Sequence, residues 1–185
     1  MIDFALAHPD AVYLSEDEAS LYLQATTSAV WAPIGQTPIV RAHPQRDKTN
    51  FYGTLNLRTG QEVVTRAETM NSEATALHLQ QILATYPEQH ILLFWDRATW
   101  HGGEAVKQLL ADNPRLEIVK YPAASPDLNP QEHVWKAARA HISHNHDRSK
   151  LAELADRFEY FLRTNTFNYS FLEKFNLETI CAICK

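Results

Sequence analysis

The stretch His90-Ile91-Leu92-Leu93-Phe94-Trp95-Asp96 decides the fold of this chain. Its near-continuous apolar run is typical of a strand buried on both faces, as in a parallel sheet that helices cover on each side. The run delivers Asp96 at its carboxyl end, where a carboxylate needs a polar partner or a metal ion. The segment therefore predicts a covered sheet and a functional acid at its edge.

Helices and strands alternate on both sides of this strand. Apolar residues at i, i+3, i+4 and i+7 predict a helix that ends at Pro87, and they are Leu79, Ile82, Leu83 and Tyr86. A second short helix carries the apolar residues of 106–110 and leads to a strand over 116–121. Two strands joined through a helix imply a parallel, right-handed crossover.

The first third of the chain has the pattern of an antiparallel meander. Short strands are predicted by β-branched and aromatic residues between turn signals, and the acidic run 16–18 lies where the first one ends. Thr59-Gly60 predicts a hairpin turn. The predicted strands are 12–14, 19–23, 38–40, 51–57 and 62–64.

The last third begins with a proline-rich segment and ends in helices. Three prolines in 122–130 predict a rigid, non-helical loop. Asn129-Pro130-Gln131-Glu132 predicts a helix start with Asn as the N-cap, and an amphipathic helix follows from about Leu151. The whole order predicts an α/β fold, in which a mixed sheet, an antiparallel meander followed by parallel strands, is flanked by helices.

Composition sets limits on the class of protein. The length of 185 residues, 45% of them hydrophobic, predicts one domain. The sequence has neither a run of about 20 apolar residues nor a signal peptide. We therefore expect a cytoplasmic protein without membrane association. The formal net charge of −5 argues against a free-standing nucleic-acid-binding protein, unless bound cations neutralise a carboxylate cluster. Cys181 and Cys184 are interpreted as reduced thiols. Basic side chains on the last helices are expected either to line a DNA groove or to be solvated. They are Lys136, Arg139, Lys150 and Arg157.

Three carboxylates form the candidate catalytic and metal-binding set. Asp17 and Asp96 are expected to meet where their strands lie side by side, and Glu132 follows Asp96 with 35 residues between them. Mg²⁺ takes one or two carboxylates and fills its other positions with water and phosphate oxygens. Two such ions about 3.5–4 Å apart would serve in-line displacement at phosphorus.

Each of these acids also has a structural interpretation. Glu132 at the third helical position fits a capping box, and Asp17 between two glutamates fits a solvated acidic turn. Asp127 is interpreted as a turn residue and left out of the site. His101 and His133 could touch DNA or a metal, but hydrogen-bonded structural histidines are the commoner case. The four tryptophans, Trp31, Trp95, Trp100 and Trp135, are interpreted as packing residues.

Two segments resemble catalytic motifs of a known family. Residues 95–101 and 121–135 look like the second and third motifs of DDE transposases of the Tc/mariner superfamily, including its bacterial insertion-sequence members. Residues 16–18 are similar to the first motif, and 31–38 to the segment after the first hairpin. The resemblance covers roughly residues 10 to 165 with its order and spacing kept.

The resemblance implies a ribonuclease-H-like catalytic domain over 1–165, followed by a tail over 166–185. It implies that Asp17, Asp96 and Glu132 bind Mg²⁺ or Mn²⁺, two ions in all, with Asp17 bridging them. The implied reaction is cut-and-paste transposition, in which water attacks at the transposon ends and the freed 3′-hydroxyl then attacks target DNA. The implied partners are transposon-end and target DNA and further copies of the chain, in a homodimer or higher assembly.

The chain departs from the family pattern at two points. Arg97 stands where relatives usually have Asn, which puts a cation beside Asp96. The helix-turn-helix region that relatives use to recognise element ends is missing, so we expect a separately encoded helix-turn-helix segment as a partner. Both departures keep open a catalytically silent assembly or regulatory module, and a related ribonuclease-H-like nuclease is the other alternative. A Ser-His-Asp hydrolase using Ser125 lacks a nucleophile elbow.

Overall fold

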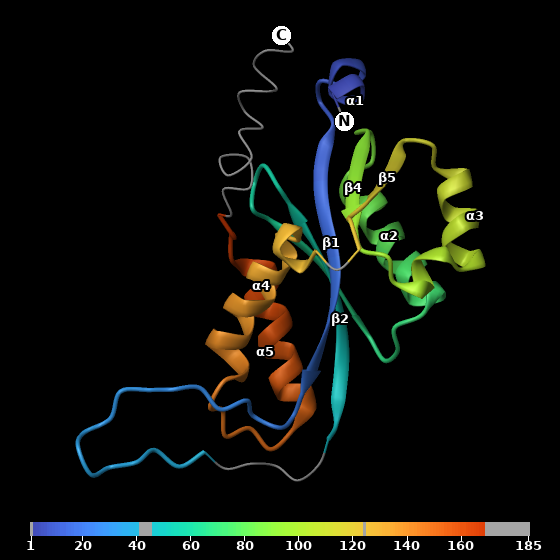
Figure 1. Cartoon of the computed structure of the whole chain (residues 1–185). Helices are drawn as coiled ribbons and strands as arrows, with labels where there is room; N and C mark the ends of the chain where they lie inside the picture. The colour runs from blue at the N-terminus through green and yellow to red at the C-terminus, as the bar shows by residue number, and fades with distance from the viewer. Residues whose placement is uncertain (1, 41–45, 124, 169–185) are drawn as a thin grey trace.

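A computed structural model describes residues 2–40, 46–123 and 125–168, and Cys181 and Cys184 lie outside these ranges (Figure 1). In chain order the elements are α1 (Ile2–Ala7), β1 (Val12–Tyr22), β2 (Lys48–Asn56), β3 (Glu62–Ala67), α2 (Ser72–Thr85), β4 (Ile91–Trp95), η1 (Thr99–Gly102), α3 (Glu104–Asp112), β5 (Leu116–Lys120), η2 (Pro126–Leu128), α4 (Gln131–Ala138), η3 (Arg139–Ser143) and α5 (Leu151–Thr164). Among the described residues, no helix has the length and apolar character needed to cross a membrane.

The five strands form one mixed sheet in the order β3-β2-β1-β4-β5. Strands β1, β2 and β3 pair antiparallel, whereas β4 pairs parallel with both β1 and β5. The predicted mixed sheet is thus confirmed, with the long strand β1 at its centre. A central position matters because β1 can present side chains to both faces of the sheet.

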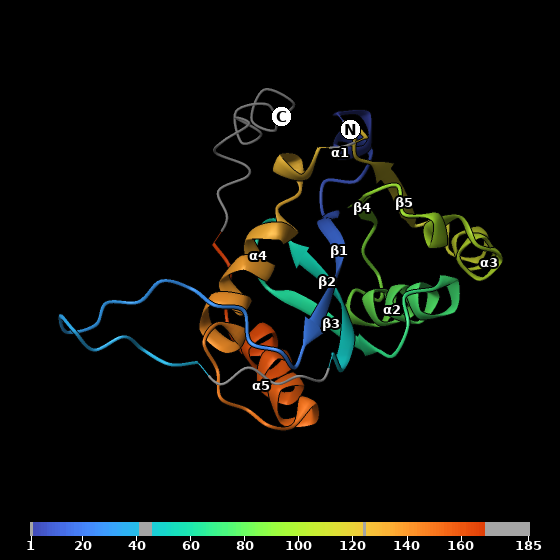
Figure 2. The ribbon, with the colours of Figure 1, turned by 60° about the horizontal axis from the view of Figure 1, so that its bottom comes forward.

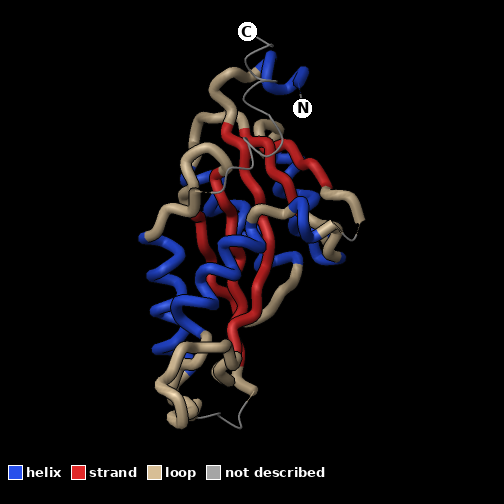
Figure 3. Tube along the Cα trace, turned by 60° about the vertical axis from the view of Figure 1, so that its left-hand side comes forward, coloured by secondary structure: helices blue, strands red, loops and turns tan. Residues whose placement is uncertain are grey.

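Helices cover both faces of the sheet (Figures 1 and 3). On one face, α2 and α3 pack through Leu79, Ile82, Val106 and Leu109 onto a core that includes Ile91. On the other face, α4 and α5 bury an aromatic and aliphatic cluster against β1, β2 and β3; it includes Trp135, Ala138, Leu154, Phe158 and Leu162. Each helix therefore buries one apolar stripe, as its period of 3.6 residues dictates.

Buried polar contacts fix α2 over the antiparallel half of the sheet. Asn71 caps the helix by accepting a hydrogen bond from the Ala74 N–H at 2.8 Å. His78, one turn further on, is fully buried, and its two ring nitrogens lie 2.7 Å from the Thr54 hydroxyl of β2 and 2.8 Å from the Thr65 hydroxyl of β3. The ring therefore joins one helix to two strands.

Strand β1 differs from its prediction, which broke it into two short strands around residues 16–18. The structure has one continuous strand from Val12 to Tyr22, so Asp17 lies inside a strand and not at its end. Within the run, Asp17 accepts a hydrogen bond from Trp135, and Glu18 is hydrogen-bonded to His101.

Residues 29–40, in the connection between β1 and β2, extend away from the body of the molecule (Figure 2). The predicted strand 38–40 is wrong, because these residues have no strand partner. The packing role expected for Trp31 is wrong as well, since this side chain is fully exposed, with Ile34 and Ile39 exposed beside it.

The proline-rich segment contains one short 3-10 turn, η2, which corrects the expectation of a wholly non-helical loop. Helix α4 is assigned from Gln131, but Asn129 Oδ1 accepts the Gln131 N–H at 3.1 Å, and the Glu132 N–H bonds to the Asn129 carbonyl. Asn129 thus performs the capping role predicted for it. Helix α5 begins at Leu151, as predicted.

Candidate active site

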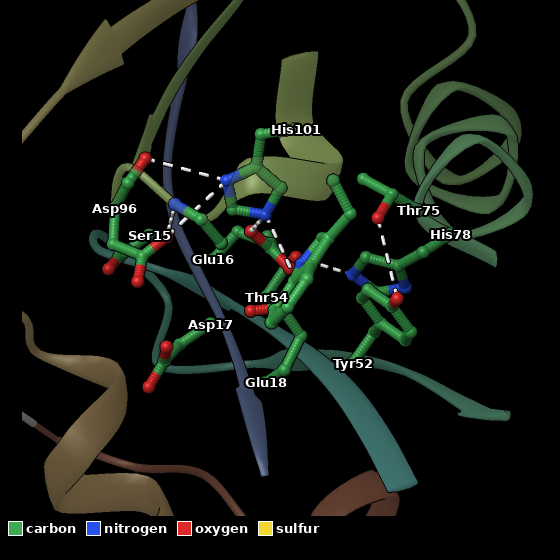
Figure 4. Close-up of polar contacts among 12 residues, drawn as sticks. Ser15, Glu16, Asp17, Glu18, Tyr52, Thr54, Thr75, His78, Asp96 and His101 are labelled. Carbon is green, nitrogen blue, oxygen red and sulfur yellow. Dashed lines mark hydrogen bonds and ion pairs between the residues drawn. The ribbon is translucent and has the colours of Figure 1, made fainter. Parts of the chain in front are cut away.

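The alternation of side chains along β1 separates three consecutive acids (Figure 4). Asp17 lies on the α4 side of the sheet, where Trp135 Nε1 donates a hydrogen bond to its Oδ2 at 3.1 Å. Glu16 and Glu18 lie on the α2 side, beside His101. The strand therefore offers one carboxylate to one face and two to the other, because its side-chain period is two.

The register of the parallel pair brings Asp17 of β1 to the end of β4 that Asp96 follows. Val12 pairs with Ile91, and the ladder runs to Ser15 opposite Phe94. Two positions beyond that last pair are Asp17, still within β1, and Asp96, the residue that follows the last residue of β4. The sequence prediction that these strands lie side by side is confirmed.

Asp96 stands at the open end of β4 with about half of its side chain exposed. Its Oδ1 accepts a hydrogen bond from the Ala98 N–H at 2.7 Å, and Oδ2 accepts none from the described residues. One oxygen is therefore anchored to the backbone, and the other is free to bind an ion.

The guanidinium of Arg97 points to the backbone. Its Nε donates to the Tyr121 carbonyl at 3.0 Å, and in the described part of the chain Arg97 forms no ion pair with an acid. The cation next to Asp96 thus serves to hold the start of the proline-rich segment against the end of β4.

Glu132 comes to the site in the first turn of α4, where it is exposed. A buried network fixes this turn to the central strand: Ser15 Oγ donates to Asn129 Oδ1 at 2.9 Å and lies 2.8 Å from the Tyr121 hydroxyl. Since Ser15 is two residues before Asp17, the cap of α4 is tied to the strand that carries the first acid.

Gly53 lets α4 come close to the sheet. It pairs with Asp17 across β1 and β2, and a Cβ there would overlap the side chains of Gln131, Glu62 and Trp135. Gln131 Nε2 donates to Glu62 Oε1 directly above this glycine. Burial raises the pKa of the Glu62 carboxyl well above its usual value, an effect that the Gln131 hydrogen bond opposes.

Electrostatics link the three predicted ligands. Burial raises the pKa of Asp17 to about 7, and the largest charge effect in the same direction comes from Glu132, with further increases from Glu18 and Asp96. Negative charge from the second and third motifs thus acts on the first acid. A cation at this position would relieve that repulsion, because an opposite charge favours the ionised form.

The charges of Asp96 and Glu132 act on Asp17, but the ligand atoms of the three acids do not converge on one point. Among the described residues, the set whose ligand atoms all lie within 4.8 Å of one another is Glu16, Glu18 and His101. Asp17, Asp96 and Glu132 do not meet that distance, and their assignment as ligands stays a prediction.

Sequence reasoning did not select the set on the α2 side of β1. Strand alternation applied to 16–18 would have indicated it, had the run been assigned to one strand. Burial and then the charge of Glu18 raise the pKa of Glu16 well above its usual value. His101, interpreted from sequence as a hydrogen-bonded structural residue, is buried against these acids.

Comparisons with known proteins show what this chain is similar to. A family model described as DDE superfamily endonuclease matches residues 12–155. A protein of Shigella sonnei, "Insertion element IS630 uncharacterized 39 kDa protein", is 27% identical over 150 residues, which cover 80% of this chain and 44% of that protein.

Solved structures share the fold. The mariner Mos1 paired-end complex with Mg matches 97% of this chain and 56% of its own with a TM-score of 0.65 at 18% identity. The catalytic domain of Mos1 mariner transposase matches 93% of this chain and 79% of its own with a TM-score of 0.60 at 14% identity.

The chain belongs to the DDE superfamily endonucleases, since the family model spans most of its length. The motif resemblance to Tc/mariner transposases and their insertion-sequence members is confirmed, and so is the ribonuclease-H-like mixed sheet. The chain spans about half the length, or less, of the full-length relatives that it matches.

Proposed function

We propose that this chain is the catalytic part of a DNA transposase that cuts phosphodiester bonds at transposon ends and transfers the freed ends into target DNA. The observation that carries the proposal is the position of Asp17. It lies on the strand that pairs parallel with β4, which Asp96 follows; it accepts a hydrogen bond from Trp135 of α4, and the charges of Asp96 and Glu132 raise its pKa. The three acids all lie within residues 12–155, the range that the family model matches.

Asp17, Asp96 and Glu132 would hold Mg²⁺ or Mn²⁺, two ions in all. The donor set fits hard cations because it consists of carboxylates only, of which Asp96 and Glu132 are exposed to water and substrate. Metal ions bound there supply activation of the attacking oxygen and charge neutralisation at the leaving oxygen. Mos1 paired-end complexes with Mg and with Mn support this choice of ions.

The chain's own residues prepare the acids for this role. Trp135 Nε1 holds Asp17 Oδ2, and the Ala98 N–H holds Asp96 Oδ1, so that each aspartate is oriented by one oxygen. The Ser15–Asn129 bond keeps the first turn of α4, and with it Glu132, against β1. Fixed orientation is the main contribution a protein makes to such a site, because misplaced ligands cost both affinity and rate.

DNA is the proposed substrate, both as transposon end and as target. The Mos1 complex with a left transposon end supports this. Lys136 is exposed one turn after Glu132, on the side of α4 where a phosphate backbone would pass. We further propose that 1–165 form the catalytic domain and 166–185 a tail, that copies assemble on DNA in the cytoplasm, and that a helix-turn-helix segment recognises the ends.

The silent-module alternative gains no support from Arg97, because its Nε is bonded to the Tyr121 carbonyl. A ribonuclease-H-like nuclease without strand transfer is the remaining alternative within enzymes. Strand transfer by a DNA carrying a free 3′-hydroxyl end separates the two activities.

The test uses the full chain, Mn²⁺ and duplex DNA carrying the element ends, with cleavage followed by a gel assay. We expect Asp96→Asn and Glu132→Gln to lower cleavage by at least about a thousand-fold, since several kcal/mol of transition-state stabilisation are removed. Asp127→Asn, an exposed acid in the same proline-rich segment, is the matched control and should cleave as the unchanged chain does. Cleavage by either active-site variant at the control's rate would contradict the proposal.

A further inference from the structure

We propose that His101 is a positioning residue of the site, which holds the Asp96 carboxylate from the opposite face of the sheet. The inference rests on the proposed role of Asp96 as a metal ligand. It assigns a task to the α2 side of β1: Glu18 holds His101, with Glu16 beside the same ring nitrogen, and His101 holds Asp96 (Figure 4).

The imidazole ring is immobilised. His101 is 5% exposed, and its ring stacks on Trp95 with 4.2 Å between centroids and an angle of 7° between planes. On the Nε2 side, Glu18 Oε1 lies at 3.0 Å and Glu16 Oε2 at 3.6 Å. Trp100 Nε1 donates to the same Glu18 oxygen, so the acid that holds the ring is itself held.

The other ring nitrogen faces Asp96. His101 Nδ1 lies 3.4 Å from Asp96 Oδ1 and 3.4 Å from the Asp96 carbonyl oxygen. Since Oδ1 also accepts the Ala98 N–H, two groups restrain this oxygen and Oδ2 is left for the ion. Distances of 3.4 Å are longer than a strong hydrogen bond, so the ring acts by restricting rotation of the carboxylate, and we expect contacts of this kind to tighten in the loaded site.

The same three residues, Glu16, Glu18 and His101, have the spacing of a metal site, and the two functions differ in what they require. A metal site would draw on Glu16, whose carboxylate oxygens are buried without a hydrogen bond. The positioning role draws on the contact of Nδ1 with Asp96, which faces away from Glu16. Binding experiments with the metal alone therefore separate them.

The experiment measures Mn²⁺ binding to the full chain by the loss of the free-ion electron paramagnetic resonance signal, together with the melting temperature of each variant. We expect His101→Ala to weaken Mn²⁺ binding by about ten-fold or more, the usual effect of losing a group that orients a ligand. His101→Asn, which keeps a donor near the position of Nδ1, should restore most of the affinity. His101→Gln, whose donor replaces Nε2, should not.

Two controls keep the outcomes apart. His78→Gln removes a buried histidine that contacts threonines, and it should lower the melting temperature with unchanged Mn²⁺ affinity. Asp96→Asn should abolish the tight binding; if it does not, the proposed function itself fails.

If Mn²⁺ binding depends on Asp96 but is unchanged in folded His101→Ala, the positioning role of His101 is overturned. The proposed function is not affected by that result. A different result would favour a metal site under α2. In that case Glu16→Gln would weaken Mn²⁺ binding as much as His101→Ala does, and Asp96→Asn would have no effect. This result would overturn the positioning role. If His101→Ala does not fold, the comparison of the Asn and Gln variants decides.

Discussion

At the scale of single residues, the site depends on a position without a side chain. Gly53 of β2 pairs with Asp17 of the neighbouring strand β1. The space where a Cβ of residue 53 would lie is occupied by the side chains of Gln131, Glu62 and Trp135. The first turn of α4 can rest on the strand only because that space is free. The separation between Asp17 and Glu132 therefore depends on the absence of one methyl group.

Gly53→Ala should push α4 away from β2. We expect a loss of about 1–3 kcal/mol in the free energy of unfolding, the usual cost of overpacking, and a further fall in DNA cleavage among molecules that remain folded. Urea unfolding and single-turnover cleavage measure the two effects. Gly102→Ala is the control, since a Cβ there meets no atom within 4 Å, and it should leave both unchanged. An unaltered cleavage rate in folded Gly53→Ala would show that the approach of α4 has no catalytic role.

The residue scale also shows what sequence could predict of the site. Asp96 was predictable because it ends an apolar strand, a local pattern. The partners of the acids were not, because Trp135 lies 118 positions from Asp17 and Trp100 lies 82 positions from Glu18. Contacts at such separations are set by the packing of the whole sheet and leave no local periodicity.

At the scale of elements, strands and helices with a clear apolar period were predicted well, and β1 was not. The acids at 16–18 have low strand propensity and resemble a turn, yet buried partners on both faces stabilise them within the strand. Residues 38–40 show the reverse case, because Ile39 and Val40 are apolar and have high strand propensity but form no strand. They resemble a strand, but they lie in an extended connection where Ile39 contacts solvent. In both segments the tertiary environment, and not the intrinsic strand propensity of the residues, determines whether a strand forms.

The connection between β1 and β2 offers a spectroscopic test. Trp31 is fully exposed, whereas Trp95 and Trp135 are 1% exposed. We expect iodide to quench a distinct fraction of tryptophan fluorescence and Trp31→Phe to remove most of that fraction with no change in melting temperature. Trp135→Phe is the matched comparison and should leave the quenchable fraction intact. Equal quenching before and after Trp31→Phe would mean that this side chain is covered in solution.

At the scale of the whole molecule, two hydrophobic clusters lie on opposite faces of the sheet, and polar contacts join the layers. His78 is one such joint. Thr65 donates to Gln81 Oε1 at 2.7 Å, so its oxygen accepts from His78 Nδ1, while Nε2 accepts from the Thr54 hydroxyl. Burial, and secondarily the charge of Arg163, lower the pKa of His78 to about 3. The folded protein therefore holds a neutral ring.

This joint makes stability depend on pH in a defined direction. Below about pH 6.5 the unfolded chain binds a proton at His78 that the folded chain does not bind until about pH 3, so the contribution of His78 to stability falls as pH falls through this window. Between neutral pH and pH 5 the contribution of this one group is a loss of roughly 2 kcal/mol. Urea unfolding at a series of pH values measures it.

His78→Gln isolates the contribution of His78 from that of Asp17, whose pKa is raised to about 7 and whose contribution to stability has the opposite sign. The variant should be less stable at pH 7, and the difference in unfolding free energy between the unchanged chain and the variant should shrink by roughly 2 kcal/mol from pH 7 to pH 5. Parallel curves for the two proteins would show that the proton on His78 does not couple to folding.

The alternation of acids along β1 also limits how this strand can change in evolution. A single-residue insertion or deletion before Asp17 would exchange the faces of Glu16, Asp17 and Glu18, so that two carboxylates would stand below α4 and one below α2. Length changes in β1 are therefore incompatible with the site, whereas substitutions that keep the register are not. The exposed connection that follows the strand has no such constraint, and related chains should vary in length there.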